Sequence, residues 1–206
     1  MHSTSTLAPA VKPPVASAVH SVWKTSIRFT LVTAVLLGIG YPLVVTGIAG
    51  LIFPHKAAGS LILKDGQIIG SELLAQSFTS DRYFHPRPSA AGNGYDATAS
   101  GGSNLAQSSK ALVDRIQGSI DKLSKENPGK PVPIDLVTTS GSGLDPDITP
   151  DAAYFQAPRV AKARGISEDR IRQLIAQNIT SRQLGFLGEP RVNVLDLNLA
   201  LDNLSK

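Results

Sequence analysis

The chain has no cysteine among its 206 residues, which excludes a disulfide framework and any thiolate metal site. It has four histidines, but no two of them have the spacing of metal ligands: His2, His20, His55 and His85. Its fold must therefore be stabilised by packing, without covalent or metal cross-links.

A calcium loop is also missing, although Asp145, Asp147 and Asp151 have the spacing that opens one. Such a loop needs glycine and glutamate at the positions where this chain has Pro150 and Gln156. Helix capping and turn formation explain the three aspartates better. We expect no metal site.

Catalytic motifs are missing in the same way. Gly129-Lys130 lacks the preceding glycine that a phosphate-binding loop requires. Ser119 and Lys122 have the S-x-x-K spacing of acyl-serine enzymes, but they fall inside a predicted helix without the companion motifs. There is no Asp-Lys-Thr-Gly phosphorylation motif either. We therefore predict that the chain is not an enzyme in its own right and has no catalytic residue.

Charged residues are missing between Arg28 and His55, where the chain reads FTLVTAVLLGIGYPLVVTGIAGLIF. This run is longer than the roughly 20 residues that a helix needs to cross a bilayer. It is too long for the apolar region of a cleavable signal peptide, and the residues after it form a poor cleavage site. A buried core helix would carry charge on one face. We predict a disordered tail over 1–24, a single transmembrane anchor over 25–54 and a domain over 55–206.

The flanks of the anchor predict its orientation. Residues 1–28 contain Lys12, Lys24 and Arg28 and no acidic residue, whereas the remainder is almost neutral. The positive-inside bias then places the N-terminus in the cytoplasm and the domain outside it. Because the domain is almost neutral, it has no charge pattern for binding nucleic acid.

Small residues recur every four positions within the anchor, at Thr30, Ala34 and Gly38 and again at Thr46 and Gly50. Such a stripe allows helix backbones to approach closely in lipid and favours a partner helix. A plain lipid-facing anchor that happens to contain small residues is the alternative. We expect Pro42 to interrupt the helix between the two parts of the stripe.

The domain is predicted to be mixed α/β. Residues 61–69 read as a hairpin around Asp65-Gly66, and 79–104 read as a long irregular loop. An amphipathic helix is expected over 109–125 and a buried strand over 134–137. Thr149, Pro150 and Gly165 delimit a further helix, which Pro158 should kink or divide.

The last part of the domain contains two more helices and a strand. Ser167 caps a helix whose apolar face includes Ile171, Leu174, Ile175 and Ile179. A strand is expected near 192–195, followed by a helix with three leucines on one side: Leu197, Leu201 and Leu204.

Three loops have unusual sequences: YFHPRPSA at 83–90, SGGSN at 100–104 and SGSGLDPD at 140–147. Glycine-rich turns that lead into helices present free backbone N–H groups, which can hold an anion. They can equally serve their own domain, with serine and aspartate capping helices and glycine adopting positive φ. The residues alone leave both readings open.

Two further motifs follow the three loops: PRV-A-AR at 158–164 and VN-L-LNLAL at 192–201. With these motifs in this order, the chain resembles the C subunit of the Kdp-type potassium-transporting P-type ATPase. The likeness spans about residues 25–205. It implies a non-catalytic subunit of a pump in the bacterial inner membrane. The implied partners are an ATP-hydrolysing subunit and a channel-like subunit that carries potassium.

The resemblance also implies roles in assembly and in raising the affinity of the ATP-hydrolysing subunit for ATP. A nucleotide contact would involve Ser100, Gly101, Gly102 and Ser103, which are similar to the signature of ABC transporters, and Gln156. The predicted topology places these residues outside the cell, where ATP is absent, so any effect on ATP would be indirect. The resemblance implies that the chain has no cofactor of its own and that ATP would belong to the partner.

The family commonly has histidine where this chain has Asp147. This position can therefore serve a capping or turn role here, but not one that needs an imidazole. A second hypothesis is a membrane-anchored extracytoplasmic hydrolase or small-molecule-binding protein with its site in the 79–104 loop. The absence of a nucleophile–base pair argues against a hydrolase.

Overall fold

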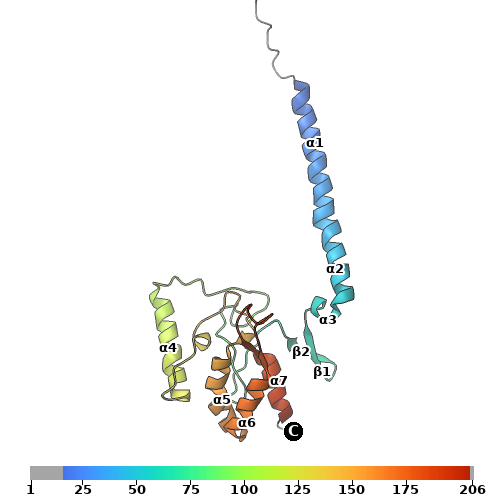
Figure 1. Cartoon of the computed structure of the whole chain (residues 1–206). Coiled ribbons are helices and arrows are strands. Elements are labelled where there is room, and N and C mark those ends of the chain that lie inside the picture. The colour runs from blue at the N-terminus through green and yellow to red at the C-terminus, as the bar shows by residue number, and fades with distance from the viewer. Residues whose placement is uncertain (1–15, 205–206) are drawn as a thin grey trace, which may run out of the picture. The chain divides into compact units, whose positions relative to one another are not determined.

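The computed structural model describes residues 16–204, which fall into two compact units divided after Ala58. The first unit is one long helical segment (Figure 1): α1 (Ala16–Val35), the π-helical turn η1 (Leu36–Gly40) and α2 (Tyr41–Ile52), followed by the short helix α3 (Pro54–Ala57). Within it, Val22–Ile52 is long and apolar enough to cross a membrane. No residue in the most apolar stretch of this segment is buried.

The helix differs from the prediction at two places. It begins at Ala16, so residues 16–24 of the predicted tail are helical, while 1–15 lie outside the described residues. Pro42 does not interrupt the helix, which passes through it with the π-helical turn just before. Proline has no N–H to donate to the carbonyl of the residue four positions earlier, and its ring clashes with that carbonyl in a regular α-helix. The wider π-helical turn accommodates both effects.

The second unit begins with the predicted hairpin, formed by β1 (Leu61–Lys64) and β2 (Gln67–Ser71). Asp65 and Gly66 between the strands have φ of 53° and 78°. A two-residue loop with two positive φ values is a type I′ turn, whose twist matches that of the paired strands. The Asp-Gly sequence favours this turn. The hairpin prediction is confirmed.

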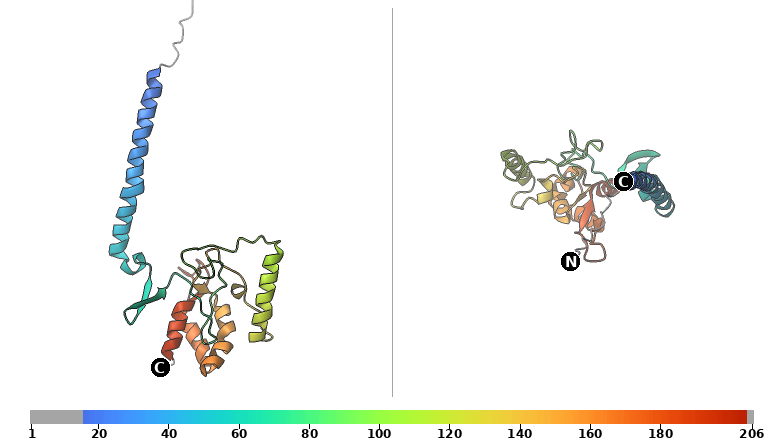
Figure 2. Two further views of the ribbon diagram at one scale, coloured as in Figure 1. Left: turned by 180° about the vertical axis from the view of Figure 1, so that it is seen from behind. Right: turned by 90° about the horizontal axis from the view of Figure 1, so that it is seen from above.

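Three helices and a small sheet form the centre of this unit. The helices α5 (Pro150–Arg164), α6 (Glu168–Gln177) and α7 (Val194–Leu204) lie side by side (Figures 1 and 2). The antiparallel sheet has the order β3-β5-β4, with β3 (Asp147–Ile148), β5 (Arg191–Asn193) and β4 (Ile179–Thr180). Fully buried side chains from these elements form the core, among them Val160, Ile171, Ile175, Val192, Leu197 and Leu201.

Local signals predicted the ends of α5, whereas Ser167 precedes α6 without the predicted side-chain cap hydrogen bond. Thr149 caps α5 by accepting a hydrogen bond from the Ala152 N–H at 3.3 Å, and Gly165 ends it with φ of 68°. The amphipathic helix α4 (Lys110–Glu126) agrees with the prediction to within a residue. Residues 72–109 contain no helix or strand, as expected for the long loop.

Four details of the prediction are wrong. The strand expected over 134–137 is the 3₁₀ turn η2 (Ile134–Leu136), in which Ile134 is 69% exposed. Of the two outcomes predicted for Pro158, division of the helix does not occur, because α5 is continuous from Pro150 to Arg164. Ile179 belongs to β4 rather than to α6, and β5 ends at Asn193, so that residues 194 and 195 are helical. A short apolar run cannot by itself distinguish a strand from a buried turn, because both need only a few buried side chains.

Candidate functional site

The 83–90 segment is held by two buried side-chain amides. The Asn198 amide, on α7, accepts from the Phe84 N–H at 2.8 Å and donates to the Phe84 carbonyl at 3.0 Å. The Gln156 amide, on α5, accepts from the His85 N–H at 2.8 Å and donates to the His85 carbonyl at 3.1 Å. Both amides are 2% exposed. They replace the neighbouring strand that an extended segment would otherwise need for its backbone hydrogen bonds.

Arg159 completes this clamp one turn after Gln156. Its guanidinium donates to the Gln156 side-chain oxygen at 2.7 Å and to the Tyr83 carbonyl at 3.1 Å. It also pairs with Glu126 at 3.1 Å. Gln156, which is predicted to contact nucleotide, thus has both ends of its amide bonded within the protein.

The three motif loops converge. The Ser89 hydroxyl donates to the Gly143 carbonyl at 2.6 Å, which joins the first loop to the third. The Gly101 N–H donates to the Ser142 carbonyl at 2.8 Å, which joins the second loop to the third, and the Ser100 hydroxyl donates to the same carbonyl at 3.0 Å. The loops therefore form one interlocked structure, which we call the loop cluster: residues 83–91, 100–104 and 138–147.

Gly143 lies at the tightest point of the loop cluster. It has φ of 67°, and a Cβ built on it would lie 2.6 Å from the Gly101 carbonyl oxygen and 2.7 Å from the Ala91 nitrogen. Only glycine satisfies both the conformation and the space. Gly141, two residues earlier, meets neither restriction.

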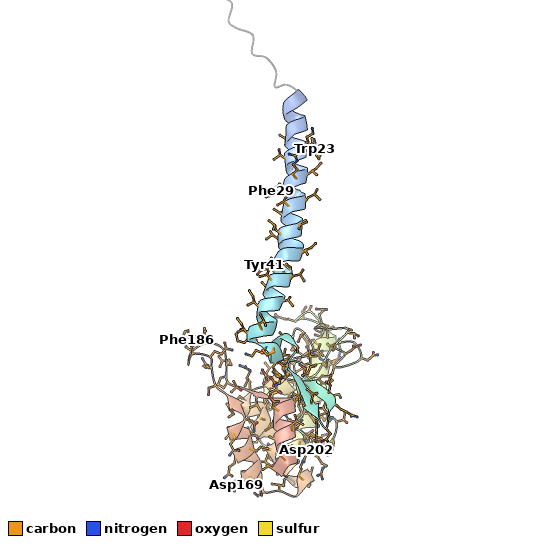
Figure 3. All side chains as sticks on the ribbon, turned by 90° about the vertical axis from the view of Figure 1, so that its right-hand side faces the viewer. Trp23, Phe29, Tyr41, Asp169, Phe186 and Asp202 are labelled. Atoms are coloured by element: carbon orange, nitrogen blue, oxygen red, sulfur yellow. The ribbon has the colours of Figure 1, made fainter. Side chains whose placement is uncertain are left out.

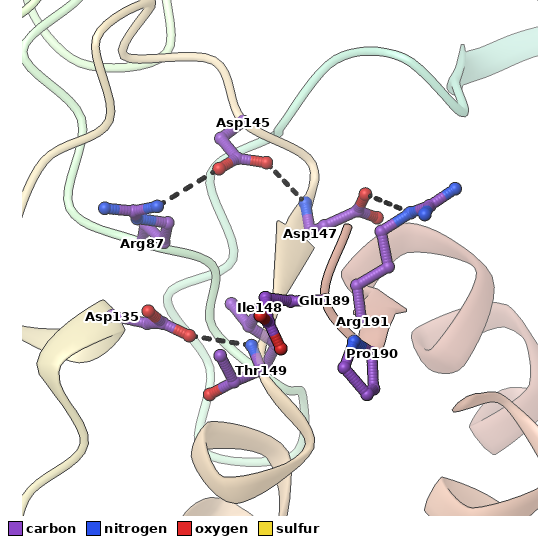
Figure 4. Close-up of a pocket in the computed structure, with 9 residues that line it drawn as sticks. All are labelled: Arg87, Asp135, Asp145, Asp147, Ile148, Thr149, Glu189, Pro190 and Arg191. Carbon is purple, nitrogen blue, oxygen red and sulfur yellow. Dashed lines mark hydrogen bonds and ion pairs between the residues drawn. The ribbon is translucent and has the colours of Figure 1, made fainter. Parts of the chain in front are cut away.

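A charged cavity of about 320 Å³ opens beside the loop cluster (Figure 4). Arg87 donates to Asp145 at 3.2 Å on one side, and Arg191 contacts Asp147 at 2.8 Å on the other. Asp145 also accepts from the Asp147 N–H at 3.1 Å, so the two ion pairs are linked through the turn. Asp135 accepts from the Thr149 N–H at 2.7 Å at the start of α5.

The carboxylates of this cavity are occupied by arginines and backbone N–H groups. Burial raises the pKa of Asp147 above its usual range, against the opposing effect of Arg191. Among the described residues, no group of three or more His, Asp or Glu side chains is arranged to hold a metal ion. Asp147 acts in a turn and in an ion pair, which are roles that need no imidazole.

A second cavity of about 320 Å³ is lined by charged and polar residues together with apolar ones; the polar lining is His85, Tyr95, Lys122, Glu126, Gln156, Ser77, Thr79 and Ser119. The His85 ring contacts the Ser80 carbonyl at 3.1 Å through Nε2. Burial and the charge of Arg159 lower the pKa of His85. Burial raises the pKa of Tyr95, whose hydroxyl donates to the Arg87 carbonyl at 2.8 Å.

The structure does not bring the predicted nucleotide residues together. Gln156 lines the second cavity, whereas Ser100, Gly101, Gly102 and Ser103 are not part of its lining. The anchor residues Thr30, Ala34, Gly38, Thr46 and Gly50 lie in the other unit, on α1, η1 and α2. Among the described residues, a Cβ on Gly38 or Gly50 would meet nothing within 4 Å.

The predicted sites omit the residues that hold the loop cluster together, namely Asn198, Arg87 and Gly143. Asn198 lies between two leucines in the apolar part of the last helix. This position of a polar amide was the only indication in the sequence that Asn198 has a structural role. A polar residue at a core position needs a buried partner. That partner is 114 residues away in the sequence, so the sequence alone could not identify it.

The comparisons with known proteins agree with each other. A family model described as "K+-transporting ATPase, c chain" matches residues 23–203. A potassium-transporting ATPase KdpC subunit from Methylobacterium nodulans is 55% identical over 195 residues, covering 87% of this chain and 97% of the relative. KdpC subunits from Acidobacterium capsulatum and Bradyrhizobium diazoefficiens are each 56% identical, covering 88% and 87% of this chain and 97% and 95% of the relatives.

Proposed function

Since this chain belongs to the family of the K+-transporting ATPase c chain, the KdpC subunits, we propose that it acts as the non-catalytic assembly subunit of that pump. Its relatives are named as one subunit of an ATPase and not as enzymes in their own right. The observation that carries the proposal is that the motif loops bond to one another and to buried amides. We infer that these bonded loops form a contact surface for other subunits rather than a reaction centre.

The apolar helix is the proposed anchor in the bacterial inner membrane. Its length and exposed apolar surface support a single crossing, and its basic N-terminal flank supports a cytoplasmic N-terminus. The domain would then lie outside the cytoplasm and rest on the outer mouth of the channel-like subunit. The loop cluster, with the charged cavity beside it, is the proposed contact surface.

Any effect on ATP affinity is proposed to be indirect, through the anchor helix or the stability of the complex. Gln156 supports this because its amide is already bonded at both ends. A photoreactive ATP analogue, applied to the full chain in detergent, tests the alternative of direct contact. Labelling of the 100–103 turn that excess ATP prevents would contradict the indirect role.

The small-residue stripe provides the sharpest test of the anchor. Gly38→Ile and Gly50→Ile together should reduce co-purification of the two partner subunits in mild detergent, because a large side chain prevents close helix approach. Gly47→Ile is the matched control, since a Cβ on Gly47 also meets nothing within 4 Å but lies outside the stripe. Equal recovery of the partners from both variants would refute packing through the stripe.

The orientation has a direct test, because the chain has no natural cysteine. A single cysteine replacing the exposed Asp169 of α6 should react with a membrane-impermeant maleimide added to intact spheroplasts. Reaction only after the spheroplasts are lysed would place the domain in the cytoplasm.

A further inference from the structure

The connection between β4 and β5 is an exposed loop with an apolar tip. Residues 181–189 are all exposed, and between the charged Arg182 and Glu189 the sequence is QLGFLG. Leu184 is 82% exposed, Phe186 69% and Leu187 47%. We call residues 182–189 the apolar loop.

The apolar loop is closed by backbone hydrogen bonds and an ion pair. Gln183 and Leu187 exchange two backbone hydrogen bonds of 2.9 Å, and Arg182 forms an ion pair with Glu189 at the base. The pair neutralises the two charges of the loop. The apolar side chains of the loop are exposed rather than packed against the domain.

The backbone at the tip is strained in a way that exposes leucine. Leu184 has φ of 52°, in the left-handed region that disfavours side chains other than those of Asn, Asp and Gly. Both the conformation and the exposure of Leu184 cost free energy in an isolated domain. They are explained if an apolar environment receives the tip.

The apolar loop leads into β5. This strand is hydrogen-bonded to the segment through which the chain enters the domain. The Asn193 amide, at the end of β5, donates to the Glu72 carbonyl at 2.8 Å, and the Glu72 N–H donates to the Ser60 carbonyl at 3.1 Å. Two residues of strand, or about 7 Å, separate Asn193 from Arg191 at the foot of the loop. The loop lies at the end of the domain opposite to Asp169 and Asp202 (Figure 3).

Further apolar side chains are exposed at this point. Leu73 and Leu74 directly follow Glu72 and are 58% and 38% exposed. Only residues 53–59 separate the apolar helix from Ser60, and eight residue steps span at most about 28 Å. The domain therefore cannot move far from lipid once the helix is embedded.

We propose that the apolar loop inserts Leu184, Phe186 and Leu187 into the membrane interface and holds the domain against the lipid surface. Phenylalanine and leucine are the side chains that enter this layer, and the loop has no unpaired charge to dehydrate. The insertion rests on the proposed membrane anchoring, but it does not depend on the proposed orientation. The occupant is the bilayer of the same membrane, rather than another protein.

The test uses the full chain in lipid nanodiscs. Phe186→Cys carries a nitroxide, and its collisions with oxygen, which concentrates in lipid, are compared with those of a water-soluble nickel chelate. Asp169→Cys, at the opposite end of the domain, is the matched control. We expect oxygen to dominate at position 186 and the nickel chelate to dominate at 169.

Two results would overturn the proposal. Nickel collisions that dominate at 186 would leave the loop in water. A label at 186 protected from both reagents would show burial against protein, such as a second copy of the chain. Failure of the full chain to enter nanodiscs would instead refute the membrane anchor itself, and so would be distinguishable from failure of the loop proposal.

Discussion

At the scale of single residues, two buried side-chain amides hold the 83–90 segment in place. Asn198 and Gln156 each bind both backbone groups of one residue in the 83–90 segment. Buried backbone groups must be bonded, and this segment has no neighbouring strand. The amides thereby fix its position between α5 and α7, from which Arg87 reaches the charged cavity.

Asn198→Ala should lower the free energy of unfolding by about 3 kcal/mol, because it leaves the buried N–H and carbonyl of Phe84 without partners. Asn203→Ala, on the same helix but exposed, should change it by less than about 0.5 kcal/mol. Urea unfolding of the full chain in detergent, followed by circular dichroism, measures both. Equal stability of the two variants would refute the clamp.

His85 should make stability depend on pH. Its folded pKa lies below the usual 6.5, because of burial and the charge of Arg159. As the pH falls through 6.5 the unfolded chain takes up a proton that the folded chain does not, so folding becomes less favourable. The effect is complete once the pH falls below the folded pKa.

Unfolding measured between pH 7.5 and 5.5 should therefore show a larger loss of stability for the native chain than for His85→Gln. Asp147 and Asp196, whose pKa values are raised by burial, are present in both proteins, so the comparison cancels their effects. Parallel stability curves for the two proteins would contradict the lowered pKa.

At the scale of elements, the loop cluster depends on close contact between glycine-rich turns. Gly143→Ala should destabilise the domain by about 3 kcal/mol, since it adds a positive-φ penalty to a clash with residues 91 and 101. Gly141→Ala is the matched control, with free space and no positive φ. Thermal unfolding of the two variants gives the comparison, and equal melting temperatures would show that the loops are not interlocked.

The sequence predicted elements whose signals are local. The Asp-Gly turn, the Thr149-Pro150 start and the Gly165 end each act within a few residues, so the hairpin and α5 were found. The sequence predicts a strand where the structure has the 3₁₀ turn Ile134–Leu136, because strand pairing depends on a partner that the local sequence does not identify. The contacts between the motif loops could not be predicted from the sequence, because they join residues far apart in the chain. Ser89 and Gly143 are 54 residues apart.

At the scale of the whole molecule, the chain combines a lone apolar helix with a domain of tightly bonded loops. Membership of the KdpC family places it in a potassium-transporting ATPase. Because its motif residues are bonded within the domain, we infer that they shape a surface for other subunits rather than a reaction centre. The predicted result is a pump that needs this chain for assembly, although the chain hydrolyses nothing.

The most direct test measures potassium-stimulated ATP hydrolysis by the pump purified from cells grown in low potassium, with and without this chain. The account predicts that omission abolishes the activity and the recovery of an intact complex, that the full chain restores both, and that the chain alone hydrolyses no ATP. A fully assembled and active pump without the chain, or ATP turnover by the chain in isolation, would contradict it.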